Sequence, residues 1–136
     1  MKYGLLYNWE TAKKAVPPGW HLPTDMEWKT LIDFAGGIEV AGKKLKAKSG
    51  WSTGFPNFNG TDDYDFSALP ACSCSSSGLI GRNINYWWTA TEKHPKANSL
   101  YIKNDNSINF EYKDKTDLKS VRCIKDKQKY CLCLNK

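Results

Sequence analysis

The segment from Thr24 to Gly37 constrains the fold more than any other part of the sequence. Thr24 and Glu27 have the spacing of a capping box, in which each side chain accepts a hydrogen bond from a backbone amide near the helix start. The residues behind this box place apolar side chains on one helix face: Trp28, Leu31, Ile32 and Ala35. Gly36 and Gly37 are suited to end the helix. The sequence therefore predicts an amphipathic helix whose apolar face needs a partner layer.

The rest of the chain predicts a second helix and a set of strands. Asn8 is a good N-cap for a shorter helix that ends at Pro17-Pro18-Gly19. Residues 48–85 are rich in Gly, Ser, Asn and Asp, which predicts a long loop packed on the core. Four later runs are rich in β-prone residues: 86–91, 100–103, 108–112 and 120–124. This order predicts an α+β domain, with two helices packed on a small twisted antiparallel sheet with long loops.

The length and the absence of long apolar runs limit the organisation of the chain. Its 136 residues fit one domain, which we expect to occupy residues 1–126, with a C-terminal tail at 127–136. No apolar run approaches the roughly 20 residues that a helix needs to cross a bilayer, so no membrane span is expected. Residues 1–4 lack the pattern of a signal peptide, so the protein either stays in the cell or has lost a leader.

The net charge of +6 comes from eighteen lysines and only two arginines, Arg82 and Arg122. Surfaces that bind nucleic acids usually favour arginine, because its fork contacts phosphate and guanine at two points. We therefore expect no nucleic-acid partner. The densest basic run, at residues 43–48, is either a solvated helix face or a patch that binds a polyanion.

Four segments together resemble one bacterial family. They read GWHLPTDMEW at 19–28, DYDFSALP at 63–70, WWTATE at 87–92 and SVRCIKD at 120–126. In this order they resemble the Fibrobacter succinogenes major paralogous domain, a module of surface proteins and lipoproteins in Bacteroidetes and their relatives. The resemblance implies a C-type-lectin-like fold, akin to formylglycine-generating enzymes and to the variable proteins of diversity-generating retroelements. It also implies a location at the cell surface or outside the cell.

Three features depart from the family pattern. Val16 stands where many relatives carry a cysteine, which leaves Cys123 without its expected partner. Asp65 replaces a frequent glycine, and Cys72-Ser73-Cys74 replaces a Gly-Tyr-Arg-like stretch. The tail at 127–136 has no counterpart in the family.

The motifs and the strand alternation predict a core rich in tryptophan, and the remaining cysteines form pairs. The expected core residues are Trp20, Leu22, Trp28, Trp87, Trp88 and Cys123. The other four cysteines form two Cys-x-Cys pairs, Cys72/Cys74 and Cys131/Cys133. These pairs are compatible with disulfides between loop and tail, with free thiols, or with a zinc site.

The sequence favours a protein without catalytic residues or cofactors. Formylglycine-generating enzymes use two thiols near the last strands as a copper site, and the cysteines of this chain do not match that spacing. His21 alternates with core residues, as a hydrogen-bonded scaffold histidine does, and His94 lies in a turn that we expect to be exposed. Residues 59–65 gather oxygen ligands like a calcium loop, although such residues more often cap backbone amides in turns.

The strands at 100–112 carry the residues that best fit a contact surface. Alternation turns one set of side chains outward, and the turn at 104–107 adds another polar residue. The predicted ligand-binding residues are Tyr101, Lys103, Asn106, Asn109 and Glu111. Tyrosine and asparagine are the adaptable contacts that recognition surfaces favour. An ordinary solvated hairpin explains the same pattern equally well.

These observations predict a monomeric, non-enzymatic module that binds a protein or glycan at the surface of a bacterium or phage. A variable protein of a diversity-generating retroelement is one form of this hypothesis. Two alternatives remain open: a thiol/copper oxidase related to formylglycine-generating enzymes, and a purely structural surface domain.

Overall fold

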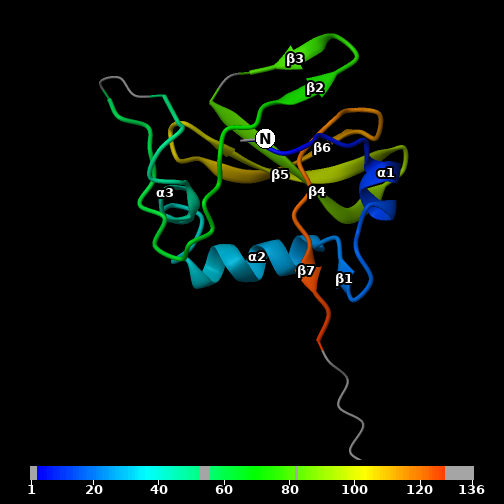
Figure 1. Ribbon diagram of the computed structural model, residues 1–136, viewed down its shortest axis with the longest axis horizontal. Helices are drawn as coiled ribbons and strands as arrows, with labels where there is room; N and C mark the ends of the chain where they lie inside the picture. The colour runs from blue at the N-terminus through cyan, green and yellow to red at the C-terminus, as the bar shows by residue number, and fades with distance from the viewer. Residues whose placement is uncertain (1–2, 53–55, 82, 128–136) are drawn as a thin grey trace, which may run out of the picture.

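The computed structural model describes residues 3–52, 56–81 and 83–127 (Figure 1). In chain order the elements are α1 (Trp9–Lys14), β1 (Trp20–His21), α2 (Asp25–Phe34), α3 (Ala41–Leu45), β2 (Ser73–Ser75), β3 (Gly78–Ile80), β4 (Ile84–Lys93), β5 (Lys96–Lys103), β6 (Ile108–Asp114) and β7 (Ile124–Lys125). The largest sheet has the order β4-β5-β6, and β1 pairs with β7 and β2 with β3 in two smaller sheets. All of these strand pairs are antiparallel.

The fold class predicted from the sequence is wrong. The protein is mainly β, built from small antiparallel sheets, and it is not the expected C-type-lectin-like α+β arrangement of two helices on one sheet. The three helices in the described part of the chain have six, ten and five residues. They are short because breakers follow closely: Pro17 and Pro18 come soon after α1, and Gly36 and Gly37 adopt positive φ angles directly after α2.

Local helix signals act as the sequence indicates. Asn8 caps α1 by accepting a hydrogen bond from the Thr11 amide at 2.8 Å. Thr24 and Glu27 form the complete capping box of α2. Trp28 and Ile32 from this helix are buried against the β4–β6 sheet, in a cluster with Trp87 and Leu100. Figure 1 shows α2 on one side of this sheet and the β2–β3 hairpin on the other.

Two apolar cores lie on opposite sides of β4. The larger core contains Trp87, and the smaller one contains Trp88 together with Trp9 and Leu22. Consecutive residues of a strand point to opposite faces, so this tryptophan pair anchors both cores. The indole groups of the smaller core are also held by hydrogen bonds, because Trp9 Nε1 donates to the Thr89 carbonyl and Trp88 Nε1 to the Tyr7 carbonyl, both at 2.8 Å.

The segment 118–120 covers the free edge of β4. The Ser120 amide donates to the Tyr86 carbonyl at 3.0 Å, and the Trp88 amide donates to the Ser120 carbonyl at 3.1 Å. On its other side, Lys119 exchanges two backbone hydrogen bonds with Tyr7. An exposed sheet edge invites pairing with other chains, so this arrangement protects the sheet.

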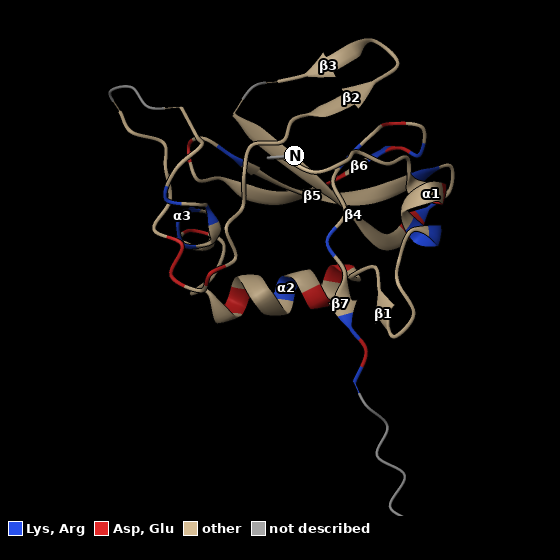
Figure 2. Ribbon diagram, viewed as in Figure 1, with Lys and Arg blue, Asp and Glu red and all other residues tan. Residues whose placement is uncertain are grey.

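The burial of two residues differs from what the sequence predicted. Trp20, expected in the core, is 43% exposed, because its two-residue strand pairs only with β7 at the periphery. Lys46 belongs to the basic run interpreted as a solvated face, yet it is fully buried. Its Nζ donates to the carbonyls of Phe58 and Asn104, at 2.6 and 2.7 Å. Figure 2 shows the other basic residues spread over several elements, including α1, α3 and β7.

Most of the other residues predicted for the core are buried. Leu22, Trp28, Trp87 and Trp88 are buried, whereas Cys123 is half-buried. None of the described helices is long and apolar enough to cross a membrane.

Candidate functional site

Four of the five predicted ligand-binding residues lie on the same side of the β4–β6 sheet. Tyr101 is the register partner of both Tyr86 on β4 and Asn109 on β6. Lys103 lies two residues after Tyr101, and Glu111 two residues after Asn109, so alternation keeps all of them on one side. Asn109 is exposed, and the other three predicted residues are half-buried. We call this surface the tyrosine face and define it by Tyr86, Tyr101, Lys103, Asn109, Glu111 and Lys113.

Asn106 lies away from this face, in the turn between β5 and β6. Its backbone φ is 71°, in the left-handed region. Its carbonyl oxygen packs so close to Gly42 of α3 that a Cβ there would lie 1.9 Å from it. The Oδ1 of its side chain is buried, without a partner among the described residues. The structure thus places Asn106 in a tight packing contact between the turn and α3.

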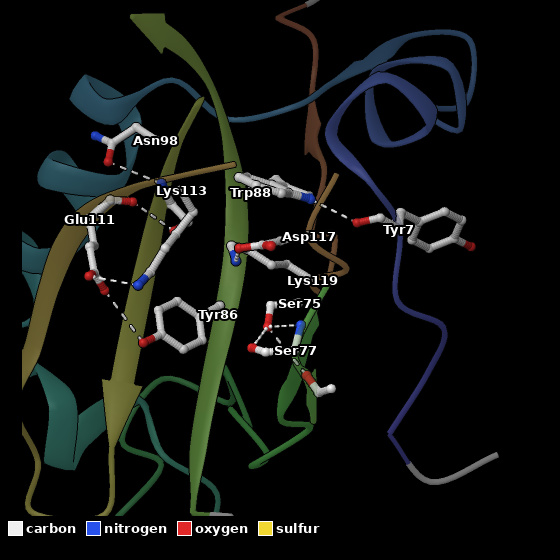
Figure 3. A network of polar contacts seen from close by, with 12 residues as sticks. Tyr7, Ser75, Ser77, Tyr86, Trp88, Asn98, Glu111, Lys113, Asp117 and Lys119 are labelled. Atoms are coloured by element: carbon white, nitrogen blue, oxygen red, sulfur yellow. Dashed lines mark hydrogen bonds and ion pairs between the residues drawn. The ribbon is translucent and has the colours of Figure 1, made fainter. Parts of the chain in front are cut away.

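Tyr86 organises the tyrosine face, and the sequence reasoning did not single it out. Its hydroxyl donates to Glu111 Oε2 at 3.5 Å (Figure 3). Its ring centroid lies 5.6 Å from that of Tyr101. Lys113 binds the other oxygen of Glu111 at 2.7 Å. Burial, and next the charge of Glu111, raise the pKa of Tyr86 to about 12. Tyr86 therefore stays a neutral donor at physiological pH. The sequence signal that could have identified Tyr86 is its spacing of two residues from Trp88, which places both side chains on one side of β4.

Lysine side chains flank the two tyrosine rings. Lys103 Nζ lies 4.9 Å from the ring centroid of Tyr101, and Lys113 Nζ lies 5.9 Å from that of Tyr86. These distances fit cation–π contacts. Lys113 is paired with Glu111, whereas Lys103 forms no direct ion pair among the described residues and acts on Asp105 at longer range. Ring edges, an amide and one ammonium group are suited to a partner that carries hydroxyl or carboxylate groups.

Lys119 supports this face from the segment that covers β4. Its Nζ is fully buried and lies 4.9 and 4.7 Å from the ring centroids of Tyr86 and Trp88. It pairs with Asp117 at 3.2 Å, and Figure 3 shows this pair beside Tyr86. Burial is the main cause that lowers the pKa of Lys119. A buried ion pair thus lies against the Tyr86 ring of the face.

A separate pocket of about 340 Å³ lies where the sequence motifs meet. We call it the motif pocket; it is lined by Pro23, Glu27, Trp28, Leu31, Tyr64, Asp65, Phe66, Arg122, Cys123 and Ile124. The Trp28 ring lies 6.1 Å from both Phe66 and Trp87. Three motifs thus supply lining residues, and Trp87 of the fourth packs behind them. The family resemblance identified these motifs, but it did not show that they meet around one pocket.

His21 lies beside this pocket and connects the N-terminal part of the chain to Asp126 near its C-terminal end. Its Nδ1 lies 2.6 Å from Asp126, and its Nε2 lies 2.7 Å from Glu27 of α2. The hydrogen bond to Asp126, and next that to Glu27, raise the pKa of His21. This geometry fits the predicted scaffold histidine.

The cysteines lie in three places. Cys72 and Cys74 are half-buried free thiols, and Cys131 and Cys133 lie outside the described residues. Cys123 lines the motif pocket, and burial raises the pKa of its thiol. In the part of the chain that the structure describes, no three His, Cys, Asp or Glu side chains are grouped to hold a metal ion.

No curated protein and no solved structure matches this chain. The family model described as the Fibrobacter succinogenes major domain matches residues 1–125, which is nearly the whole sequence. The matched range includes every lining residue of the motif pocket. The chain therefore belongs to the Fibrobacter succinogenes major domain family.

Proposed function

We propose that this domain is a non-enzymatic binding module of a bacterial or phage surface protein, and that the tyrosine face contacts its ligand. One observation carries the proposal: Tyr101, Lys103, Asn109 and Glu111 share one side of the β4–β6 sheet and keep part of their surface open to solvent. Contact surfaces concentrate such amphipathic and polar side chains on a rigid support.

The construction of the sheet supports this role. The strand β5, which carries Tyr101, is hydrogen-bonded on both sides, to β4 and β6. Its opposite side is anchored by Leu100 and Ile102, which are fully buried. The backbone therefore keeps its position when side chains on the tyrosine face change, so specificity can change at little cost in stability.

The ligand class that fits this chemistry is a protein or glycan with hydroxyl or carboxylate groups. Tyrosine rings pack against apolar faces and donate hydrogen bonds at their hydroxyl end. The Lys103 ammonium adds a preference for negative charge. A relation to the variable proteins of diversity-generating retroelements, and a location at the cell surface, agree with this proposal and stay predictions of the motifs.

The proposal is tested by incubating the labelled domain with arrays of bacterial and host glycans and of extracellular proteins. We expect the parent chain to bind at least one array feature and the double variant Tyr101→Ala/Asn109→Ala to lose that signal. Tyr112→Ala is the matched control, because Tyr112 is exposed on the opposite side of β6. No bound feature for the parent chain, or equal binding by the double variant, contradicts the proposal.

A further inference from the structure

The motif pocket has the dimensions and lining of a small-molecule site, and it is distinct from the tyrosine face. It lies between α2 and residues 64–66 and is bordered by residues 122–124. Its volume of about 340 Å³ falls within the range of ligand pockets, roughly 300–1,000 Å³. Most of its wall is apolar, through Pro23, Leu31, Tyr64 and Phe66.

Arg122 brings a cation to this pocket. Its Nη1 donates to the Phe66 carbonyl at 2.5 Å, and its guanidinium lies 4.0 Å from the Phe66 ring centroid. Across residues 3–52, 56–81 and 83–127, no carboxylate forms an ion pair with Arg122. Asp62, the acidic residue that acts on it electrostatically, is engaged with the Ser67 amide and hydroxyl at 2.6 and 2.5 Å. Asp62 therefore supplies part of the counter-charge at a distance, and the partly desolvated guanidinium, which forms no direct ion pair within the described ranges, can still bind an anionic ligand.

Trp28 adds a second donor that lacks an acceptor. It is only 3% exposed and lines the same pocket. Its Nε1 is buried, and within the described ranges it has no hydrogen-bond partner. An indole N–H can only donate, and buried donors in folded proteins are nearly always satisfied. Because Trp28 lines the pocket, its indole N–H signal is suited to report a ligand bound there.

The two acidic residues that line the pocket are engaged by hydrogen bonds or screened by solvent. Glu27 accepts a hydrogen bond from the Thr24 amide at 2.9 Å, and its other oxygen lies 2.7 Å from His21. Both of its oxygens are therefore occupied. Asp65 is exposed, so solvent and salt screen its charge.

We propose that the motif pocket binds a small carboxylate with an apolar, aromatic body, whose carboxylate is recognised by Arg122 and whose ring lies against the apolar wall. Guanidinium–carboxylate hydrogen bonds are among the strongest that proteins form, and they have a fixed geometry. The limited volume favours a free acid over a longer chain. This site goes beyond the proposed function, since none of its lining residues belongs to the tyrosine face.

The test follows the indole N–H signals of the full chain by heteronuclear NMR, with the Trp28 signal assigned from the Trp28→Phe variant. The probes are 3-phenylpropionate, its neutral amide, phenethylamine, and an acetylated peptide that ends in phenylalanine. We expect 3-phenylpropionate to shift the Trp28 signal saturably and the amide to bind at least about ten-fold more weakly, as loss of a charge-assisted bond implies.

Variants of Arg122 complete the test. Arg122→Gln should weaken 3-phenylpropionate binding at least about ten-fold. Lys125→Gln removes a cation from an exposed position on β7 and should bind like the parent chain. If Arg122→Gln does not fold, Arg122→Lys replaces it and should bind more weakly than the parent, because the fork is lost.

Four outcomes would overturn the proposal. The first is that 3-phenylpropionate causes no saturable shift of the Trp28 signal, and the second is that the amide or the amine binds as tightly as the acid. The third is that the Arg122 variant that folds binds 3-phenylpropionate like the parent chain. The fourth is that the peptide binds more tightly than the free acid. The last outcome would assign the pocket to a chain terminus.

Discussion

Trp87 and Trp88 are neighbours in the chain, yet their side chains belong to two different cores on opposite sides of β4. Trp87 packs with Trp28 and Phe66 behind the motif pocket, at ring distances of 6.1 and 6.2 Å. Trp88 packs with Trp9 and donates a hydrogen bond to Tyr7. One dipeptide therefore joins the helix α2, the N-terminal segment and the sheet that carries the tyrosine face.

Replacing either tryptophan should cost much of the stability of the domain. We expect Trp87→Ala and Trp88→Ala each to lower the free energy of unfolding by about 3–5 kcal/mol, because each leaves a large cavity. Trp20→Ala is the control; its side chain is 43% exposed, so the loss should stay below about 1 kcal/mol. Denaturant unfolding measures all three. A large loss for Trp20→Ala would contradict the assignment of the cores.

Gly42 should be intolerant of any side chain. A Cβ at this position would lie 1.9 Å from the carbonyl oxygen of Asn106. Either α3 or the β5–β6 turn must then shift, so we expect Gly42→Ala to destabilise the domain by about 1–3 kcal/mol. Gly37→Ala isolates the backbone cost, because Gly37 has a φ of 94° and open space around it. It should lose about 1 kcal/mol. Thermal or denaturant unfolding that tolerates Gly42→Ala better than Gly37→Ala would show that the contact is loose.

Lys46 should make the domain more stable as the pH rises through the alkaline range. Burial lowers its pKa in the folded state to about 8, whereas the ordinary value is 10.5. The unfolded chain therefore binds more protons between these values, and stability increases with pH there by up to about 3 kcal/mol. Lys46→Met should abolish this increase, and the exposed control Lys48→Met should keep it. Denaturant unfolding between pH 7 and 10.5 measures the slope, and equal slopes for both variants would contradict the burial argument.

Tyr86 should act in the opposite direction at higher pH. Its pKa in the folded state is raised to about 12, from an ordinary value of 10.0. The folded state therefore holds the proton more tightly, so this contribution is complete below pH 10 and is lost as the pH approaches 12. Tyr86→Phe should remove that loss, which spectrophotometric titration and unfolding above pH 10 can follow. A Tyr86 that ionises at its ordinary pKa would contradict the network with Glu111.

His21 should favour the folded state on the acid side of neutrality. Its pKa is raised above 6.5 by Asp126 and Glu27, so its contribution is complete below that value and is lost as the pH rises through the raised pKa. The pairs are more than one third exposed, so the effect should stay below about 1 kcal/mol. His21→Gln should flatten this part of the stability profile. An unchanged profile in His21→Gln would contradict the pairing with Asp126 and Glu27.

Features set by neighbouring residues could be predicted from the sequence, and features set by distant contacts could not. The caps at Asn8 and Thr24 and the turn at 104–107 depend on residues within one turn, and the structure confirms them. The burial of Lys46 depends on carbonyls of Phe58 and Asn104, up to 58 residues away in the chain. No local pattern reveals such a contact.

The difference between local and distant contacts also explains which residues of the tyrosine face could be predicted. Alternation on β5 and β6 correctly grouped Tyr101, Lys103, Asn109 and Glu111, since period-two geometry is local. Asn106 was predicted with them from its place in the turn, and the structure brings its backbone carbonyl against Gly42. The β2–β3 hairpin was predicted as loop, because its serine- and glycine-rich sequence has little strand propensity.

The central claim is that Tyr101 and Asn109 of the tyrosine face contribute to binding and little to stability. The most direct measurement compares affinity for the ligand found on the arrays with the thermal midpoint, for Tyr101→Ala, Asn109→Ala and the control Tyr112→Ala. We predict that the first two weaken binding at least about ten-fold while their midpoints stay within about 3 °C of the parent, and that the control changes neither. Unfolded variants at positions 101 and 109, or undiminished affinity in both, would contradict the claim.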